Sequence, residues 1–147
     1  MSGALGAEAL LLFEKSPGAF PLCQALSDWV LSTWPDARVK VQKTQIGFYG
    51  PGLFACASLT PVRPRAQRPD PYLTVTFSLA CPLDDPRALC VPVRPGRFTH
   101  HVLIGRAEDL DAQLKEWIVQ SHALAGLHRA ARSTKGTVST KCSKCKT

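Results

Sequence analysis

Two segments far apart in the chain carry basic side chains at positions where strand alternation turns a residue inward. Val39 and Val41 alternate with polar residues, so the same period of two turns Lys43 toward the buried face. His100 alternates in the same way with Val102 and is also expected to point inward. A buried amine or imidazole is costly without a partner, and burial lowers its pKa. Basic residues placed in this way are typical of functional sites.

Arg97 and Thr44 complete the candidate site. Arg97 lies three residues before His100 at the start of the same strand, and its planar guanidinium group could hold an anion. We assign Lys43, Thr44, Arg97 and His100 as candidate ligand-binding residues and predict that they line one pocket. The alternative interpretation is structural: Lys43 extends to solvent at the sheet edge, and His100 is a core histidine bonded to a backbone carbonyl.

The function that this pocket favours is non-enzymatic binding of an anionic small molecule or peptide. The first alternative is an enzyme that uses Lys43 and His100 as an acid/base pair, because a desolvated lysine can act as a base or nucleophile. The sequence lacks the HExxH, Walker A, GxSxG and Rossmann glycine motifs. We therefore assign no catalytic residue, no metal and no cofactor.

The charge distribution indicates a second alternative, which is nucleic acid. The formal net charge is +7, and the basic surplus lies in residues 38–106 and in residues 129–147. The latter segment holds six basic residues and no acidic one. We expect weak, non-specific nucleic-acid binding through this tail. A larger role is disfavoured because the chain has no helix-turn-helix motif and no aromatic residues interleaved with basic ones.

Cysteine usage and hydropathy indicate the compartment. Six cysteines without an export signal favour reduced thiols over a disulfide framework. Cys142 and Cys145 form a CxxC pair that supplies only two of the four ligands of a structural zinc site, so we expect exposed thiols there. The remaining four lie in apolar patterns typical of buried cysteine: Cys23, Cys56, Cys81 and Cys90. No segment is apolar enough to span a membrane, and the sequence predicts a soluble cytoplasmic protein.

Helices at both ends and strands between them must position these residues. One helix begins at Ser16-Pro17 and ends before Pro35. A second helix has Asp109 and Asp111 in its first turn, an apolar stripe that starts at Leu110, and Gly126 as its expected end. Alternating patterns predict strands near residues 38–42, 53–59, 73–79, 89–93 and 98–104. The prediction is a single α+β domain over residues 1–128, in which an antiparallel sheet of about five strands has both helices packed on one side. Residues 129–147 are predicted to be a disordered tail.

Several of these segments resemble one known domain family. Lys43-Thr44-Gln45-Ile46-Gly47-Phe48 is similar to the KTxIxF signature of DUF5655, a bacterial domain of unknown function. Further similar segments are Phe54-Ala55, the run from Pro95 to Val102, and Asp109-Leu110-Asp111 followed by Trp117. The resemblance covers about residues 13–125, and the family looks distantly related to small YdhG-like domains. It implies a compact α+β domain and no established reaction, and it does not include the loop from Pro61 to Pro71 or the tail.

Overall fold

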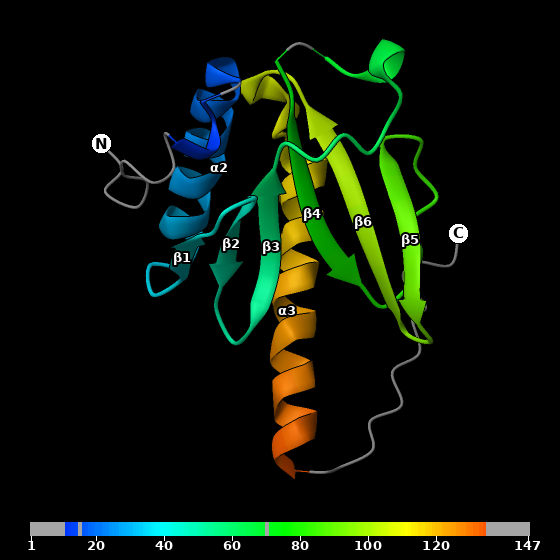
Figure 1. Cartoon of the computed structure of the whole chain (residues 1–147). Coiled ribbons are helices and arrows are strands. Elements are labelled where there is room, and N and C mark those ends of the chain that lie inside the picture. The colour runs from blue at the N-terminus through cyan, green and yellow to red at the C-terminus, as the bar shows by residue number, and fades with distance from the viewer. Residues whose placement is uncertain (1–10, 15, 70, 135–147) are drawn as a thin grey trace.

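The described part of the chain, residues 11–14, 16–69 and 71–134 of a computed structural model, forms a six-stranded antiparallel sheet with helices α2 and α3 on one face (Figure 1). This arrangement confirms the predicted α+β class and the placement of both helices on one side. The elements in chain order are η1 (Pro17–Ala19), α2 (Phe20–Thr33), β1 (Arg38–Val41), β2 (Gln45–Tyr49), β3 (Leu53–Ser58), η2 (Arg65–Gln67), β4 (Leu73–Leu79), β5 (Ala88–Arg94), β6 (Arg97–Ile104), η3 (Ala107–Asp109) and α3 (Ala112–Thr134).

The strands of this sheet follow the spatial order β1-β2-β3-β4-β6-β5. The sequence predicted about five strands, and β2 is the additional one. The chain reverses at a tight turn in which the Gln42 amide donates to the Gln45 carbonyl at 2.8 Å. Lys43 and Thr44 lie in this turn, between the apolar residues of β1 and those of β2. Ile46 and Phe48, which follow the turn, are fully buried.

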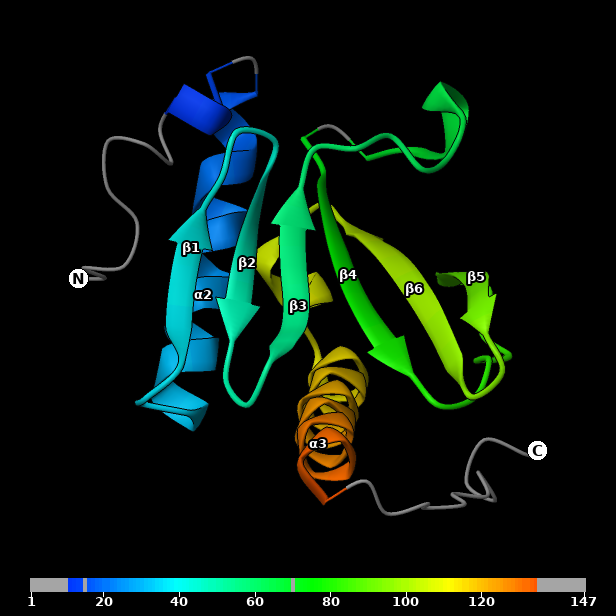
Figure 2. The same cartoon turned by 60° about the horizontal axis from the view of Figure 1, so that its bottom comes forward.

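The core lies between the two helices and the sheet. In Figure 2, α2 lies behind β1 and β2, and α3 packs on β3 and β4. Burial of each large apolar side chain contributes roughly 1.5–3 kcal/mol. The largest fully buried apolar residues come from the segment before η1, from both helices and from the sheet: Phe13, Leu26, Val30, Ile46, Phe48, Phe54, Leu73, Phe77, Ile104, Leu114 and Ile118. The opposite face of the sheet carries neither of the two helices.

Helix α3 begins at a side-chain cap. The Leu114 amide donates to Asp111 Oδ1 at 2.9 Å, and Arg87 forms an ion pair with the same carboxylate at 3.1 Å. The hydrogen bond donated by the Leu114 N–H, together with the neighbouring Arg87, holds the pKa of Asp111 below its usual value. No helix in the described ranges is long and apolar enough to cross a membrane.

The end of α3 differs from the prediction. Gly126 does not terminate the helix, which continues to Thr134. An interior glycine costs only about 1 kcal/mol, and the residues around it are good helix formers. The first residues of the predicted tail, 129–134, are therefore helical. Residues 135–147, with Cys142 and Cys145, lie outside the described residues.

The cysteines follow the prediction only in part. Cys23, Cys56 and Cys90 are free thiols. Burial raises the pKa of Cys23 to about 12 and that of Cys56 to about 11, so both are protonated at neutral pH. Cys81 is disulfide-bonded. The expectation of reduced thiols is therefore wrong for Cys81.

The β5–β6 hairpin depends on a left-handed glycine. Gly96 has φ +80°, a conformation that costs a residue with a side chain about 1 kcal/mol or more. We expect Gly96→Ala to lower the free energy of unfolding by about 1 kcal/mol, measured by urea denaturation. Gly52→Ala is the matched control, because the added methyl would meet only the Ala125 Cβ at 3.9 Å. An equal loss in both variants would show that the backbone of Gly96 is not the cause.

Candidate functional site

The predicted site residues do not meet. Lys43 and Thr44 are exposed in the turn between β1 and β2, whereas Arg97 begins β6. Strands β2, β3 and β4 separate β1 from β6, and the turn lies at the end of the sheet opposite to Arg97. Lys43 and Arg97 line two different cavities. The predicted shared pocket is therefore wrong, because the chain reverses after Val41 and the alternation of β1 does not reach Lys43.

His100 points inward, as strand alternation predicted. It is fully buried, and its ring stacks on Phe77 with the ring centres 5.5 Å apart. The Leu83 amide donates to His100 Nε2 at 3.1 Å, so the neutral ring carries its proton on Nδ1. Burial lowers the pKa of His100 to about 4. His100 is thus an uncharged core histidine, as the structural alternative expected: its Nε2 accepts from the Leu83 N–H, and a weaker backbone hydrogen-bond contribution from Phe98 opposes the effect of burial on its pKa.

A gap between β3 and β4 creates the cleft that does contain Arg97. The two strands pair only where Cys56 to Ser58 face Thr74 to Thr76, and they separate beyond this point. Ser121 of α3 closes the gap on the face of the sheet that carries the helices. Its hydroxyl donates to the Phe54 carbonyl at 2.7 Å and accepts from the Ser78 amide at 3.1 Å. One buried side chain therefore satisfies both strands where they stop pairing.

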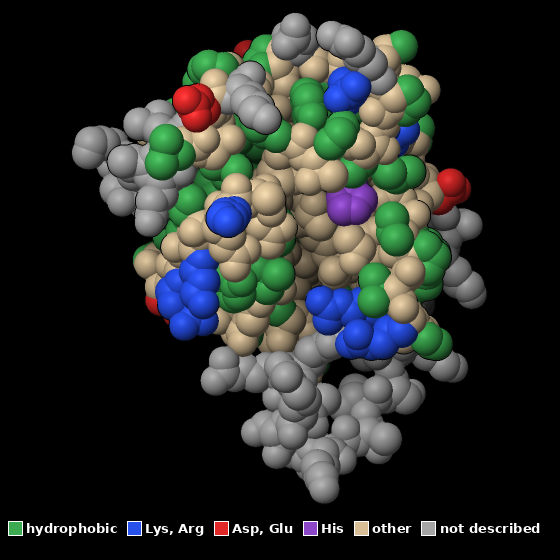
Figure 3. Space-filling view, viewed as in Figure 1, with side chains coloured by type: hydrophobic (Ala, Val, Ile, Leu, Met, Phe, Trp, Pro, Cys, Tyr) green, Lys and Arg blue, Asp and Glu red, His purple; other side chains and the backbone are tan. Residues whose placement is uncertain are grey.

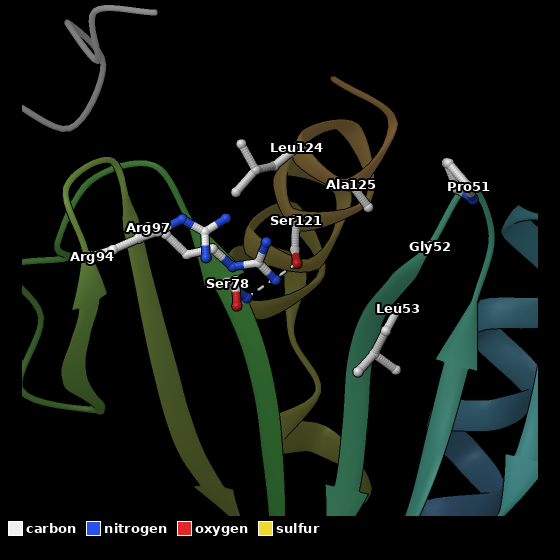
Figure 4. A pocket seen from close by; sticks show the side chains of 9 residues that line it. All are labelled: Pro51, Gly52, Leu53, Ser78, Arg94, Arg97, Ser121, Leu124 and Ala125. Carbon is white, nitrogen blue, oxygen red and sulfur yellow. Dashed lines mark hydrogen bonds between the residues drawn. The ribbon is translucent and has the colours of Figure 1, made fainter. Parts of the chain in front are cut away.

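The cleft has a volume of about 340 Å³ and receives two arginines from the β5–β6 hairpin. Figure 4 shows the side chains of Arg94 and Arg97 extending toward Ser78 and Ser121. Figure 3, which looks onto the sheet face opposite α3, shows a hollow flanked on both sides by Lys and Arg side chains. The lining residues come from the β2–β3 turn, β3, β4, the β5–β6 hairpin and α3: Pro51, Gly52, Leu53, Ser78, Arg94, Arg97, Ser121, Leu124 and Ala125.

The electrostatics of the cleft favour a negative group. Partial burial and the neighbouring charge of Arg94 lower the pKa of Arg97, although a guanidinium stays protonated at neutral pH. Arg94 and Arg97 are paired residues of the hairpin, and their charges repel each other. Within the described ranges, the six strands contain no Asp or Glu. An anion in the cleft would offset both this repulsion and the desolvation of Arg97.

Of the residues that line the cleft, the sequence patterns identified only Arg97. Arg94 and Arg97 flank the Pro95-Gly96 turn, and this symmetric spacing around a tight hairpin could have paired them. Leu53 belongs to the predicted strand near residues 53–59, but next to the register shift at Phe48/Tyr49 it is 39% exposed at the cleft. No local sequence pattern indicated a role for Ser121, because that role depends on the separation of two strands that are distant from it in sequence.

Most of the described chain matches one known protein family. A domain family of unknown function, DUF5655, matches residues 12–125. This match extends from before α2 into the part of α3 that lines the cleft. The chain belongs to the DUF5655 family. No curated protein and no solved structure matches the chain.

The two segments that the sequence analysis compared with the family lie in different parts of this DUF5655 domain. The KTxIxF segment forms the β1–β2 turn and β2, and its Ile46 and Phe48 belong to the core. The second segment, from Pro95 to Val102, contains the hairpin turn, Arg97 and His100. The cleft therefore lies against the second segment, while the first segment contributes to the hydrophobic core.

Proposed function

We propose that this DUF5655 domain is a non-enzymatic binding module that holds the anionic group of a small molecule or peptide between Arg94 and Arg97. The observation that carries the proposal is the entry of two guanidinium groups into one cleft of a sheet whose strands contain no carboxylate in the described part of the chain. Each planar guanidinium can donate two parallel hydrogen bonds to a carboxylate or phosphate.

The remaining lining defines the rest of the ligand. Leu53, Leu124 and Ala125 present apolar surface beside the arginines. The Ser121 hydroxyl already donates to one strand and accepts from the other, so the arginines supply the main contacts to an anion. A ligand that carries an apolar or aromatic group next to its negative group fits this lining best.

The enzyme alternative gains no support from the geometry. The proposed acid/base pair required Lys43 and His100 to act on one substrate. Lys43 is exposed in the β1–β2 turn, and His100 is buried against Phe77 with its Nε2 bonded to Leu83. Neither residue lines the cleft. The proposed function therefore rests on binding.

The test measures binding of phenyl phosphate and benzoate to the full-length protein by isothermal titration calorimetry. Because a charge-assisted hydrogen bond contributes about 1.5–3 kcal/mol, we expect Arg97→Gln or Arg94→Gln to weaken binding by at least about tenfold. Lys43→Gln is the matched control, since it removes one exposed positive charge away from the cleft. Equal weakening in Lys43→Gln, or unchanged binding in both arginine variants, would refute the proposal.

A further inference from the structure

We propose that the helix-free face of the sheet binds single-stranded nucleic acid, with a backbone phosphate seated between Arg94 and Arg97 and a base stacked on Tyr49. This inference rests on the proposed function, because the cleft supplies the phosphate site. It differs from the weak binding through residues 129–147 that the sequence predicted, since it assigns the contact to the folded sheet.

Positive charge lies near both edges of the helix-free face, on β1 and at the β5–β6 hairpin. In β1, the half-buried Val39 and Val41 pack against the core, so Arg38 and Lys40 point to the opposite face and are exposed. Arg94 and Arg97 lie across the cleft from them, at the β5–β6 hairpin. Figure 3 shows Lys and Arg side chains on both sides of the hollow and Asp or Glu side chains only at the margin of this view. The face is therefore complementary to a polyanion.

An aromatic ring lies between the two basic groups. Tyr49 pairs with Leu53 of the cleft, and Lys40 pairs with Gly47 in the adjacent strand. A Cβ atom on Gly47 would come within 2.9 Å of Tyr49 Cε1, so the absent side chain of this glycine makes room for the ring. Lys40 Nζ lies over the face of that ring, 5.1 Å from its centre, so a stacked base takes the place of this ammonium group, which then faces the adjoining phosphate. The order across the face is thus a cation, an aromatic ring, an apolar side chain and the arginine cleft.

The width of this arrangement favours a chain over a small anion. Four strand spacings separate β1 from β6, and at about 4.8 Å each they amount to roughly 19 Å. A single phosphate or carboxylate cannot contact Lys40 and Arg97 at once, whereas several linked nucleotides can. A duplex keeps its base faces stacked internally, while a single strand offers them to Tyr49. The ring and the two basic groups together therefore select a single strand.

The experiment uses the full-length protein and a fluorescein-labelled oligothymidylate of about ten nucleotides, a length within the usual range for single-strand sites. Fluorescence anisotropy at several salt concentrations gives the affinity and its salt slope. We expect Tyr49→Leu to weaken binding about tenfold and Tyr49→Phe to retain it, because the ring face is what stacks. We expect Lys40→Gln to reduce the salt slope by about 0.7, the value for one phosphate of a single strand.

The controls separate the sheet face from the tail and from the cleft. Residues 129–147 are unchanged in every variant, so equal binding by wild type, Tyr49→Leu and Lys40→Gln would overturn the inference. Tighter binding of a matched duplex would overturn it as well. If Arg97→Gln loses phenyl phosphate while Tyr49→Leu and Lys40→Gln bind the oligonucleotide normally, the inference fails and the proposed function stands. If phenyl phosphate does not bind through the arginines, the proposed function fails.

Discussion

Replacing Ser121 with alanine should lower the free energy of unfolding by about 2–4 kcal/mol, although the change removes only one oxygen atom. The side chain is 2% exposed, and its hydroxyl joins the Phe54 carbonyl to the Ser78 amide. Alanine leaves both backbone groups without a partner where β3 and β4 no longer pair, and each unsatisfied buried group costs about 1–3 kcal/mol. Urea denaturation followed by circular dichroism measures the loss.

Ser27→Ala is the matched control for this change. Ser27 lies in α2, is 0% exposed, and its Oγ has no hydrogen-bond partner among the residues that the structure describes. Alanine there removes an unsatisfied hydroxyl and improves helix propensity, so we expect the free energy of unfolding to stay unchanged or to rise by up to about 1 kcal/mol. A similar loss in both variants would show that the bridge between β3 and β4 does not stabilise the sheet.

Acidification from about pH 6.5 to about pH 4 should remove up to about 3 kcal/mol of stability through His100 alone. Burial lowers the pKa of His100 from 6.5 to about 4, so the folded protein favours the neutral ring and the unfolded chain takes up the proton first. The stabilisation is complete above the unfolded pKa and is lost as the pH falls through the folded one. Protonation of Nε2 also destroys the acceptor for the Leu83 amide.

The variant His100→Gln is the control for this pH dependence. The amide oxygen of His100→Gln can accept from the Leu83 amide and does not titrate, so denaturation between pH 7 and pH 4 should show a flatter pH dependence. Burial also lowers the pKa values of His101 and His122, and these two residues leave a residual slope in both proteins. The same pH profile for wild type and His100→Gln would contradict the assignment.

The fold was predictable where periodic patterns are long. The helical spacing ahead of Pro35 and the alternation from Leu73 to Leu79 both correspond to observed elements, α2 and β4. β2 was missed because it is five residues long and carries Gly47 at its centre, so its pattern merges with the turn before it. The end of α3 was misplaced because a glycine costs too little to stop a helix in good helix-forming surroundings.

The site was less predictable than the fold, because it depends on which strands lie next to each other. Alternation correctly oriented His100, but it could not show that three strands separate β1 from β6. Arg97 was selected for its neighbours in sequence, and its partner Arg94 became evident only across the hairpin. Ser121 and Leu124 reach the cleft because β3 and β4 diverge, a tertiary effect that no local pattern encodes.

The most direct test of the anion-binding cleft is a nuclear magnetic resonance titration of the full-length protein with phenyl phosphate. We expect saturable shifts of the Arg94 and Arg97 side-chain Nε–H signals and of the Ser78 and Ser121 amides, with no change at Lys43. Shifts confined to the β1–β2 turn, or changes that never saturate at Arg94 and Arg97, would contradict the cleft as the binding site of this domain.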